Sequence, residues 1–373
     1  MKKIVFILIL VPFLSFDQMT KQDSVWLPFK KIRLVVSLTA ILIISHKSFS
    51  QTTLATGEQP QITVSSKGFV RLVFGEKDKI LYSTSIDNGK TFSKPVLIGE
   101  VKEMHLGVTR GPQLASSKDY SVVTAMDKKG NIHAFRLTHK DGAWKKIANV
   151  NDVDASAPEG LMSIAADDNN NFFAVWLDLR EGQKNNISFS VLKGNSKWNK
   201  NSFAYKSPES HVCECCKPSI AVRGNNVSIM FRNWLKGSRD LYLVTSTNNG
   251  QSFSGAQKLG KGTWLLKGCP MDGGGLTIDS KEQIHTAWQR DGQIYYAKPG
   301  QQEEKIGAGR HVDLNGNIVT WESGSDLIVK QLNGGEKKIG EGTALKVYEF
   351  IDKSIIAVWE KDDHIVFKKI SKS

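Results

Sequence analysis

From residue 51 onward the chain alternates short apolar runs with polar turns. Most of these runs are four to seven residues long, and Gly, Asn or Asp residues bound them. Almost no stretch shows the spacing of apolar residues that an amphipathic helix requires. Short alternating runs separated by turn-forming residues are typical of β-strands. The pattern therefore predicts an all-β fold.

The apolar runs recur as a set. One member is a strand that ends in an aromatic residue, a short run precedes it, and a polar turn and a further strand follow it. The clear copies of the aromatic-ended strand are Val70–Phe74, Phe172–Trp176, Val227–Phe231, Ile284–Trp288, Ile318–Trp321 and Ile355–Trp359, and Tyr120–Ala125 is a weaker seventh. Seven copies between residues 51 and 373 give a period of about 46 residues, which is typical of four-stranded propeller blades. We predict a single-domain β-propeller of seven blades, or of six full blades with an irregular closure.

The two ends of this repeat region complement each other. The last copy ends on its third strand, so one outer strand is missing from that blade. An open strand edge would remain unpaired. We predict that Gln51–Thr56 supplies the missing strand and closes the ring.

The first fifty residues form a targeting segment rather than part of the fold. Their apolar stretches Ile4–Phe16 and Leu34–Ser45 are shorter than the roughly 20 residues that a membrane-spanning helix needs. Lys30, Lys31 and Arg33 precede the second stretch, and a small-residue cleavage site follows it, as in a signal peptide. We divide the chain into a signal segment, 1–50, in which Met19 is a candidate start, and a propeller, 51–373. An uncleaved anchor is the alternative, and both predict export to the periplasm, the cell surface or the medium.

Net charge does not indicate nucleic-acid binding. The chain carries a formal charge of +13, and the targeting segment contributes five of these charges. The remaining excess is mostly scattered Lys, and no nucleic-acid-binding motif is present. We expect a monomer without a membrane span in its mature part.

Two turns carry a sharper motif, Ser-x-Asp-x-Gly-x-Thr-Phe. In this Asp box the Asp or Asn side chain accepts backbone N–H groups, and the glycine adopts a positive φ. The aromatic residue is expected to pack beneath the blade. The key positions of the Asp box are Ser85, Asp87, Gly89 and Phe92 in the first copy and Ser246, Asn248, Gly250 and Phe253 in the second. These residues are expected to be structural.

Two Asp boxes on a seven-fold all-β repeat resemble the sialidase superfamily, also called BNR repeat proteins. The resemblance covers most of residues 60–370. It implies a propeller whose central mouth binds ligand and, in active members, hydrolysis of terminal sialic acid. Such enzymes use three arginines on the sugar carboxylate, a Tyr nucleophile assisted by a Glu, and an Asp acid/base.

The resemblance transfers to this chain only in part. Arg232 resembles the second arginine, Arg290 the third, Glu214 the assisting Glu and Tyr348 the nucleophile. The first arginine is absent from its expected place at Pro60–Thr63, where Arg110 from the next blade is a substitute. No Asp stands where the acid is expected. The alternative is that these arginines form ion pairs in loops.

A cysteine cluster is not part of the sialidase pattern. Alignment of two successive repeats brings all four cysteines of the chain near one mouth of the channel. Three hypotheses compete: a disulfide between adjacent blades, a soft-metal site for copper or zinc, and redox chemistry at a thiol pair. The candidate residues are Cys213, Cys215, Cys216, Cys269, His211 and Met271.

These observations predict an exported propeller that recognises a polar ligand, a glycan or glycoprotein, at its channel mouth. Sialic-acid hydrolysis is the enzymatic hypothesis and requires no cofactor. A non-catalytic binding module and a copper- or zinc-binding protein are the alternatives.

Overall fold

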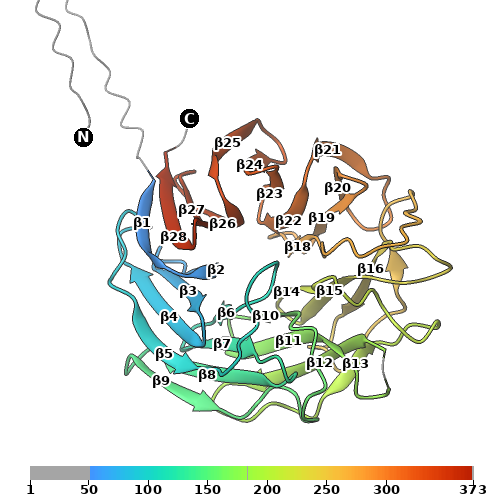
Figure 1. Ribbon diagram of the computed structural model, residues 1–373, viewed down its shortest axis with the longest axis horizontal. Coiled ribbons are helices and arrows are strands. Elements are labelled where there is room, and N and C mark those ends of the chain that lie inside the picture. Colours follow the sequence, from blue (N-terminus) through green and yellow to red (C-terminus); the bar gives the residue numbers. More distant parts are fainter. Residues whose placement is uncertain (1–50, 183, 372–373) are drawn as a thin grey trace, which may run out of the picture. The chain divides into compact units, whose positions relative to one another are not determined.

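The computed structural model describes residues 51–182 and 184–371, which form seven four-stranded antiparallel sheets arranged as a ring (Figure 1). The predicted all-β propeller is confirmed, with seven complete blades rather than six. The predicted signal segment, including Met19, lies outside the described residues. Among the described residues, none belongs to a helix long and apolar enough to cross a membrane.

Six blades are continuous in sequence. Their strands run from the centre of the ring to its edge in chain order: β2 (Glu58–Val64), β3 (Val70–Glu76), β4 (Lys79–Ser85), β5 (Val96–Glu100); β6 (Gln113–Ser116), β7 (Tyr120–Met126), β8 (Ile132–Thr138), β9 (Ala143–Ile147); β10 (Met162–Ala166), β11 (Asn171–Asp178), β12 (Asn186–Lys193), β13 (Ser202–Tyr205); β14 (Ser219–Arg223), β15 (Asn226–Arg232), β16 (Leu241–Ser246), β17 (Gln257–Lys258); β18 (Gly275–Ile278), β19 (Ile284–Arg290), β20 (Gln293–Ala297), β21 (Glu304–Ala308); and β22 (Arg310–Asn315), β23 (Ile318–Ser323), β24 (Asp326–Gln331), β25 (Glu336–Glu341).

The seventh blade joins the two ends of the propeller. It contains β26 (Thr343–Glu349), β27 (Ile355–Lys361), β28 (His364–Ile370) and, as its outer strand, β1 (Thr52–Thr56). Thr52 pairs with Phe367 and Thr56 with His364. The predicted closure by the start of the folded region is therefore confirmed.

The innermost strands of neighbouring blades contact one another around the channel. Hydroxyl groups bridge several of these contacts. Thr63 Oγ1 lies 3.0 Å from Ser116 Oγ, and the Ser219 hydroxyl donates to the Gly274 carbonyl at 2.7 Å. Hydrogen bonds at these positions allow the centre of the ring to stay polar without leaving buried groups unsatisfied.

Apolar side chains fill the spaces between the blades. The aromatic residues at the ends of the second strands are the largest of them, and Trp176, Trp288, Trp321 and Trp359 are at most 2% exposed. Since each blade is covered on both faces by its neighbours, these strands are apolar along nearly their whole length rather than alternating. The aromatic residue that marks each repeat in the sequence therefore also fills the space between neighbouring blades.

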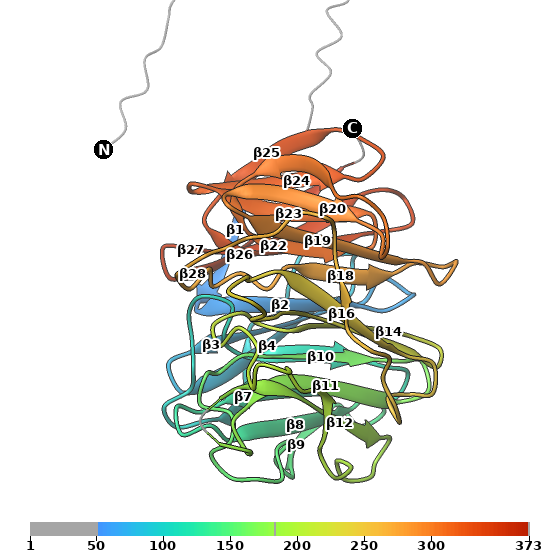
Figure 2. The same cartoon turned by 90° about the vertical axis from the view of Figure 1, so that its right-hand side faces the viewer.

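The antiparallel order separates two faces of the propeller. The first strand of every blade begins at the face where the second strand ends, and the third strand ends at the opposite face. Figure 2 shows the blades from the side. Residues just before the inner strands therefore share one face, and both Asp boxes, which follow third strands, lie on the other.

Both Asp boxes have the predicted hydrogen bonds. Asp87 Oδ1 accepts the N–H groups of Lys90 and Thr91 at 3.0 Å each. Slight burial opposes its ionisation, but hydrogen bonds from Thr91, Ser85 and Lys90 lower the pKa of Asp87 to about 2. The rings of Phe92 and Phe367 pack edge to face at 4.8 Å, which ties this turn to β28.

In the second copy Asn248 takes the place of the aspartate. Asn248 Oδ1 accepts the Ser252 N–H at 3.0 Å, and the Ser246 hydroxyl accepts the Gly250 N–H at 2.9 Å. Gly250 has a φ of +78°, and a Cβ there would lie 2.4 Å from the ring of Phe189. Phe253 packs on the same ring, with the ring centroids 5.1 Å apart.

Removal of residues 51–56 is expected to destabilise the whole ring. The deletion exposes the edge of β28 and the pairing groups of the seventh blade. We expect Tm to fall by about 5 °C or more, together with concentration-dependent association through the open edge. Calorimetry and size-exclusion chromatography test this against a chain that begins at Gln51. Equal Tm values and elution volumes would contradict the closing role of β1.

Candidate functional site

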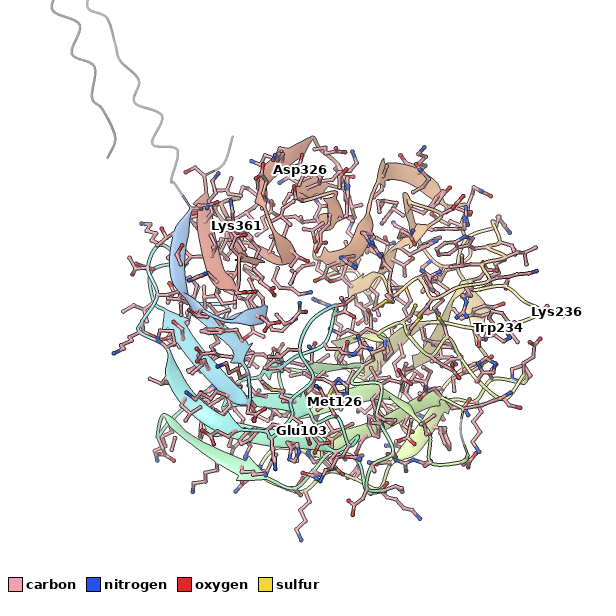
Figure 3. The ribbon with its side chains drawn as sticks, viewed as in Figure 1. Glu103, Met126, Trp234, Lys236, Asp326 and Lys361 are labelled. Atoms are coloured by element: carbon pink, nitrogen blue, oxygen red, sulfur yellow. A yellow bond between two sulfur atoms is a disulfide. The ribbon has the colours of Figure 1, made fainter. Side chains whose placement is uncertain are left out.

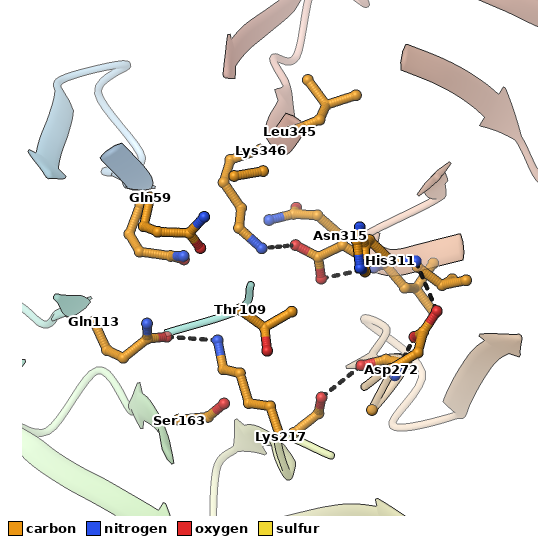
Figure 4. A pocket seen from close by; sticks show the side chains of 18 of the residues that line it. Gln59, Thr109, Gln113, Ser163, Lys217, Asp272, His311, Asn315, Leu345 and Lys346 are labelled. Carbon is orange, nitrogen blue, oxygen red and sulfur yellow. Dashed lines mark hydrogen bonds and ion pairs between the residues drawn. The ribbon is translucent and has the colours of Figure 1, made fainter. Parts of the chain in front are cut away.

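A cavity of about 530 Å³ opens at the channel mouth where the inner strands begin (Figure 4). All seven blades contribute to its wall, through residues near the start of each inner strand. Most of the side chains are amides, hydroxyls and charged groups, among them Gln59, Gln61, Thr109, Gln113, Ser163, Lys217, Ser219, Asp272, Thr277, His311, Asp313, Asn315, Glu322, Thr343, Lys346 and Glu360. A concave site with many converging polar groups is suited to a polar ligand.

Lys217 is one of two lysines that point into this cavity (Figure 4). Its ammonium donates to Gln113 Oε1 at 2.7 Å, so its hydrogen-bond partner there is a neutral amide. Burial, reinforced by the positive charge of Lys346, lowers the pKa of Lys217 to about 7. An anion beside this group would stabilise its protonated form.

Lys346 enters from the opposite side of the cavity and forms an ion pair with Asp313 (Figure 4). Burial favours protonation of the aspartate, but Lys346, together with Lys217, holds the pKa of Asp313 below its usual value. The pair balances one ammonium with one carboxylate. Lys217 is left without a directly bonded carboxylate in the described structure.

A hydrogen-bonded group of acidic residues forms the adjoining wall. The buried Asp272 accepts the His311 N–H at 2.6 Å, and the His311 ring lies 2.7 Å from Glu322. Glu322 also accepts the Thr343 hydroxyl at 2.6 Å. Burial raises the pKa of Glu322, but these hydrogen bonds and the His311 charge outweigh it and lower the pKa overall.

The cysteine cluster lies directly behind this wall. Cys216 precedes Lys217, and Cys269 lies three residues before Asp272. Gly273 allows the two segments to touch, because a Cβ there would stand 1.8 Å from the Lys217 carbonyl oxygen. The loops before β14 and β18 are joined by a Cys215–Cys269 disulfide with a Cα–Cα distance of 6.1 Å.

All four cysteines thus meet at one place, as the repeat alignment predicted, and one pair forms a disulfide between adjacent blades. Cys213 and Cys216 are free and buried, with their sulfurs 3.4 Å apart. Arg239 Nη1 lies 2.9 Å from Cys213 Sγ. The hydrogen bond with Cys216 and the charge of Arg239 outweigh burial and lower the pKa of Cys213 to about 6. Burial and the neighbouring Cys213 raise the pKa of Cys216.

Arg232 does not face the cavity. It is 1% exposed, and its guanidinium donates to the carbonyls of Asp272, Arg239 and Gln289 at 2.6 to 3.1 Å. These bonds use its donors to hold the ends of β15 and β19 together with the loop before β18. The predicted carboxylate-binding role is corrected to a structural one, since backbone carbonyls occupy the guanidinium.

The other four predicted catalytic residues are dispersed. Arg290 pairs with Glu303 at 2.9 Å, and Arg110 donates to the Glu159 carbonyl at 2.8 Å. The Glu214 carboxylate is exposed beside His211, and Tyr348 packs in the apolar layer between the first and last blades. None of the five lines the central cavity as the described residues form it. The predicted convergence of arginines with a Tyr–Glu pair is therefore corrected.

His211, a further candidate metal ligand, is not grouped with the sulfurs among the described residues. His211 stacks on Trp234, in the outer part of the loop that follows β15 (Figure 3). Among the described His, Cys, Asp and Glu residues, the grouped potential ligands are Cys213, Cys215 and Cys216. Met271 is half-buried with a φ of +52°. Cys215 and Cys269 cannot act as thiolates while they are bonded to each other, so a copper or zinc site stays a prediction.

The cavity residues themselves were missed by sequence reasoning. Asp313 and Lys346 are each the fourth residue of an inner strand, whereas Lys217 lies two residues before the start of the inner strand of another blade. A polar residue that recurs in or just before the first strand of each repeat is the signal that would have indicated them. The sequence carries no comparable signal for Arg239, because its contact with Cys213 joins two different loops.

Replacement of Arg232 by Ala is expected to affect stability strongly. It leaves three carbonyl groups without their donor, two of them in buried contacts. We expect the free energy of unfolding to fall by about 3–5 kcal/mol. Urea denaturation measures this, and the exposed Arg223→Ala variant serves as a control with an expected loss below about 0.5 kcal/mol. A loss below about 1 kcal/mol for Arg232→Ala would contradict the structural role.

Replacement of Arg239 by Gln is expected to raise the pKa of Cys213. The guanidinium is the positive charge bonded to this sulfur, and its removal is expected to shift the pKa upward by about 1–3 units. Thiolate absorbance at 240 nm during a pH titration reports the midpoint. Lys236→Gln, at an exposed lysine near the tip of the same loop (Figure 3), is the control. An unchanged midpoint in Arg239→Gln would refute this account of the low pKa.

No known protein family and no curated protein matches this chain. Solved propeller structures do resemble it. They include an ulvan lyase bound to GlcA(1-4)Rha3S (10% identity, TM-score 0.55, 86% of this chain and 96% of that one). Also similar is a virginiamycin B lyase from Staphylococcus aureus with quinupristin (13% identity, TM-score 0.53, 87% of this chain and 100% of that one). A third is an α-L-arabinanase from Penicillium chrysogenum with arabinobiose (11% identity, TM-score 0.51, 87% of this chain and 98% of that one). These likenesses show the seven-bladed propeller fold, and membership of the sialidase superfamily stays a prediction.

Proposed function

We propose that this chain is an exported propeller that recognises a glycan with an acidic group in its central cavity. The observation that carries the proposal is the pair of lysines that enter the cavity from opposite sides, one of which has a neutral hydrogen-bond partner. A carboxylate or sulfate between them would supply the missing negative charge. The surrounding amides and hydroxyls match the hydroxyl groups of a sugar.

Other features support a glycan as the ligand. The fold is shared with propellers whose solved complexes contain arabinobiose and GlcA(1-4)Rha3S, the second of which carries acidic groups. The cavity volume of about 530 Å³ lies within the range of small-molecule sites. Gln59, Gln61 and Gln113 add amides that can both donate and accept hydrogen bonds.

The arrangement favours binding over sialoside hydrolysis. Hydrolysis would require the arginines and the Tyr–Glu pair at the ligand, whereas Arg232 and Arg290 are bonded elsewhere and Tyr348 packs between blades. We therefore propose a binding module as the primary role. A fluorogenic sialoside is expected to release no aglycone above the uncatalysed rate.

Binding is expected to depend on pH through Lys217. An anionic ligand raises the pKa of the ammonium in the complex above its free value of about 7. Affinity is therefore highest below pH 7 and falls by up to about tenfold per pH unit above it, until the pKa of the bound state is reached. Calorimetric titration with 3′-sialyllactose and with a glucuronate-containing oligosaccharide, compared with lactose and arabinobiose, measures this dependence.

Lys217→Met is expected to lower affinity for the acidic probes by at least about tenfold and to remove the pH dependence. Lys236→Gln changes an exposed lysine far from the cavity and is the matched control. Lack of binding to both acidic probes, or equal affinity in Lys217→Met and the unaltered chain, would overturn the proposal. Release of the sialoside aglycone would instead reinstate the enzymatic hypothesis.

A further inference from the structure

An exposed disulfide covers a buried pair of thiols at the rim of the propeller. Cys269 is exposed and Cys215 is half-buried, whereas Cys213 and Cys216 are each 1% exposed. Cys213 Sγ lies 3.7 Å from Cys215 Sγ and 3.4 Å from Cys216 Sγ. One buried sulfur thus touches both the disulfide and the second free thiol. The role proposed for the central cavity does not require this arrangement.

We propose that the four cysteines form a thiol–disulfide exchange site. In this site the buried Cys213 and Cys216 pair passes two electrons, through the Cys215–Cys269 disulfide, to an external disulfide. This activity is separate from glycan recognition. It would make the rim of the cavity a reducing site for small or peptide disulfides.

The internal transfer has two steps. The Cys213 thiolate attacks Cys215 Sγ, so that a Cys213–Cys215 bond forms, the Cys215–Cys269 bond breaks and Cys269 leaves as a thiolate. The Cys216 thiolate then attacks Cys213 Sγ and releases the Cys215 thiolate. The disulfide has moved from the exposed pair to the buried pair, without any external oxidant or reductant.

The external transfer also has two steps. The exposed Cys269 thiolate attacks an external disulfide and releases one thiolate of it. Cys215 then attacks the mixed disulfide at Cys269, releases the second thiolate and restores the Cys215–Cys269 bond. Overall, the buried dithiol is oxidised, the external disulfide is reduced to two thiols, and the two thiol protons pass to these products. An external dithiol would recharge the site by the reverse steps.

The surroundings favour Cys213 as the internal nucleophile. Arg239 Nη1 donates to its sulfur at 2.9 Å and stabilises the thiolate that attacks. The guanidinium is held in place because it also donates to the Leu266 carbonyl and lies over the Trp234 ring. The Cys213-x-x-Cys216 spacing places the resolving thiol 3.4 Å from the same sulfur, within reach of a disulfide bond.

Reaction with dithiobis-nitrobenzoate under native conditions tests the site. The unaltered protein has two free thiols, and we expect release of two nitrothiobenzoate equivalents per chain without a lasting adduct. Peptide mass spectrometry is then expected to find Cys213–Cys216 and Cys215–Cys269 disulfides. Oxidised glutathione serves as a second probe. Absence of release in the native protein, with two thiols counted after denaturation, would overturn the proposal.

The Cys216→Ser variant identifies the route. Without the resolving thiol the relay stops at a Cys213–Cys215 disulfide with a nitrothiobenzoate adduct on Cys269, and one equivalent is released. Direct attack of Cys213 on the probe would instead place the adduct on Cys213 and leave Cys215–Cys269 intact. An adduct on Cys269 supports the relay, and an adduct on Cys213 refutes it.

A Cys215→Ser/Cys269→Ser double variant provides the control for access. It keeps the buried dithiol but removes the exposed disulfide through which the relay passes. We expect native release to slow by at least about tenfold, because buried thiols react poorly. Retained far-UV circular dichroism and a count of two thiols after denaturation would show that the fold and the thiols are intact. Release at the unaltered rate in a folded double variant would contradict the relay.

Discussion

The pairing of β1 with β28 is the interaction on which the rest of the structure depends. It turns a row of seven sheets into a closed ring, because it supplies the last blade with a strand from the other end of the folded region. Closure forces the seven inner strands around a common channel, with their starting ends on one face. Side chains separated by almost the whole folded region, such as Gln59 and Lys346, then line the same cavity.

The packing at this face shows how a buried arginine can serve the backbone rather than a ligand. Strand ends leave carbonyl groups that must be satisfied where water is excluded. Arg232 satisfies three of them across two blades, and this use of its donors removes it from the cavity. Arg239 lies in the loop after the same strand and donates to the Cys213 sulfur. Two arginines of one blade thus bind different groups, backbone carbonyls and a thiol.

The cavity and the cysteine cluster share a wall. Segments 213–219 and 269–275 carry cysteines on one side and Lys217 and Asp272 on the other, and they lie together because Gly273 leaves room for the Lys217 carbonyl. The disulfide fixes the same two segments. A change in the bonding of the sulfurs therefore acts on the segments that position Lys217. This physical link connects the ligand cavity with the state of the cysteines, although their proposed activities are separate.

The sequence by itself determined the propeller repeat, the closing strand, the Asp-box turns and the meeting of the cysteines, whereas the structure decided for seven blades over six. Each of these follows from a local pattern repeated at a fixed period, and the ring converts equal positions in the repeat into neighbours in space. Only the tertiary structure decided where individual side chains point. Arg232 donates to backbone carbonyls, Tyr348 packs between blades, and Lys217 points into the cavity. These orientations depend on burial and on hydrogen-bond partners that are distant in the chain.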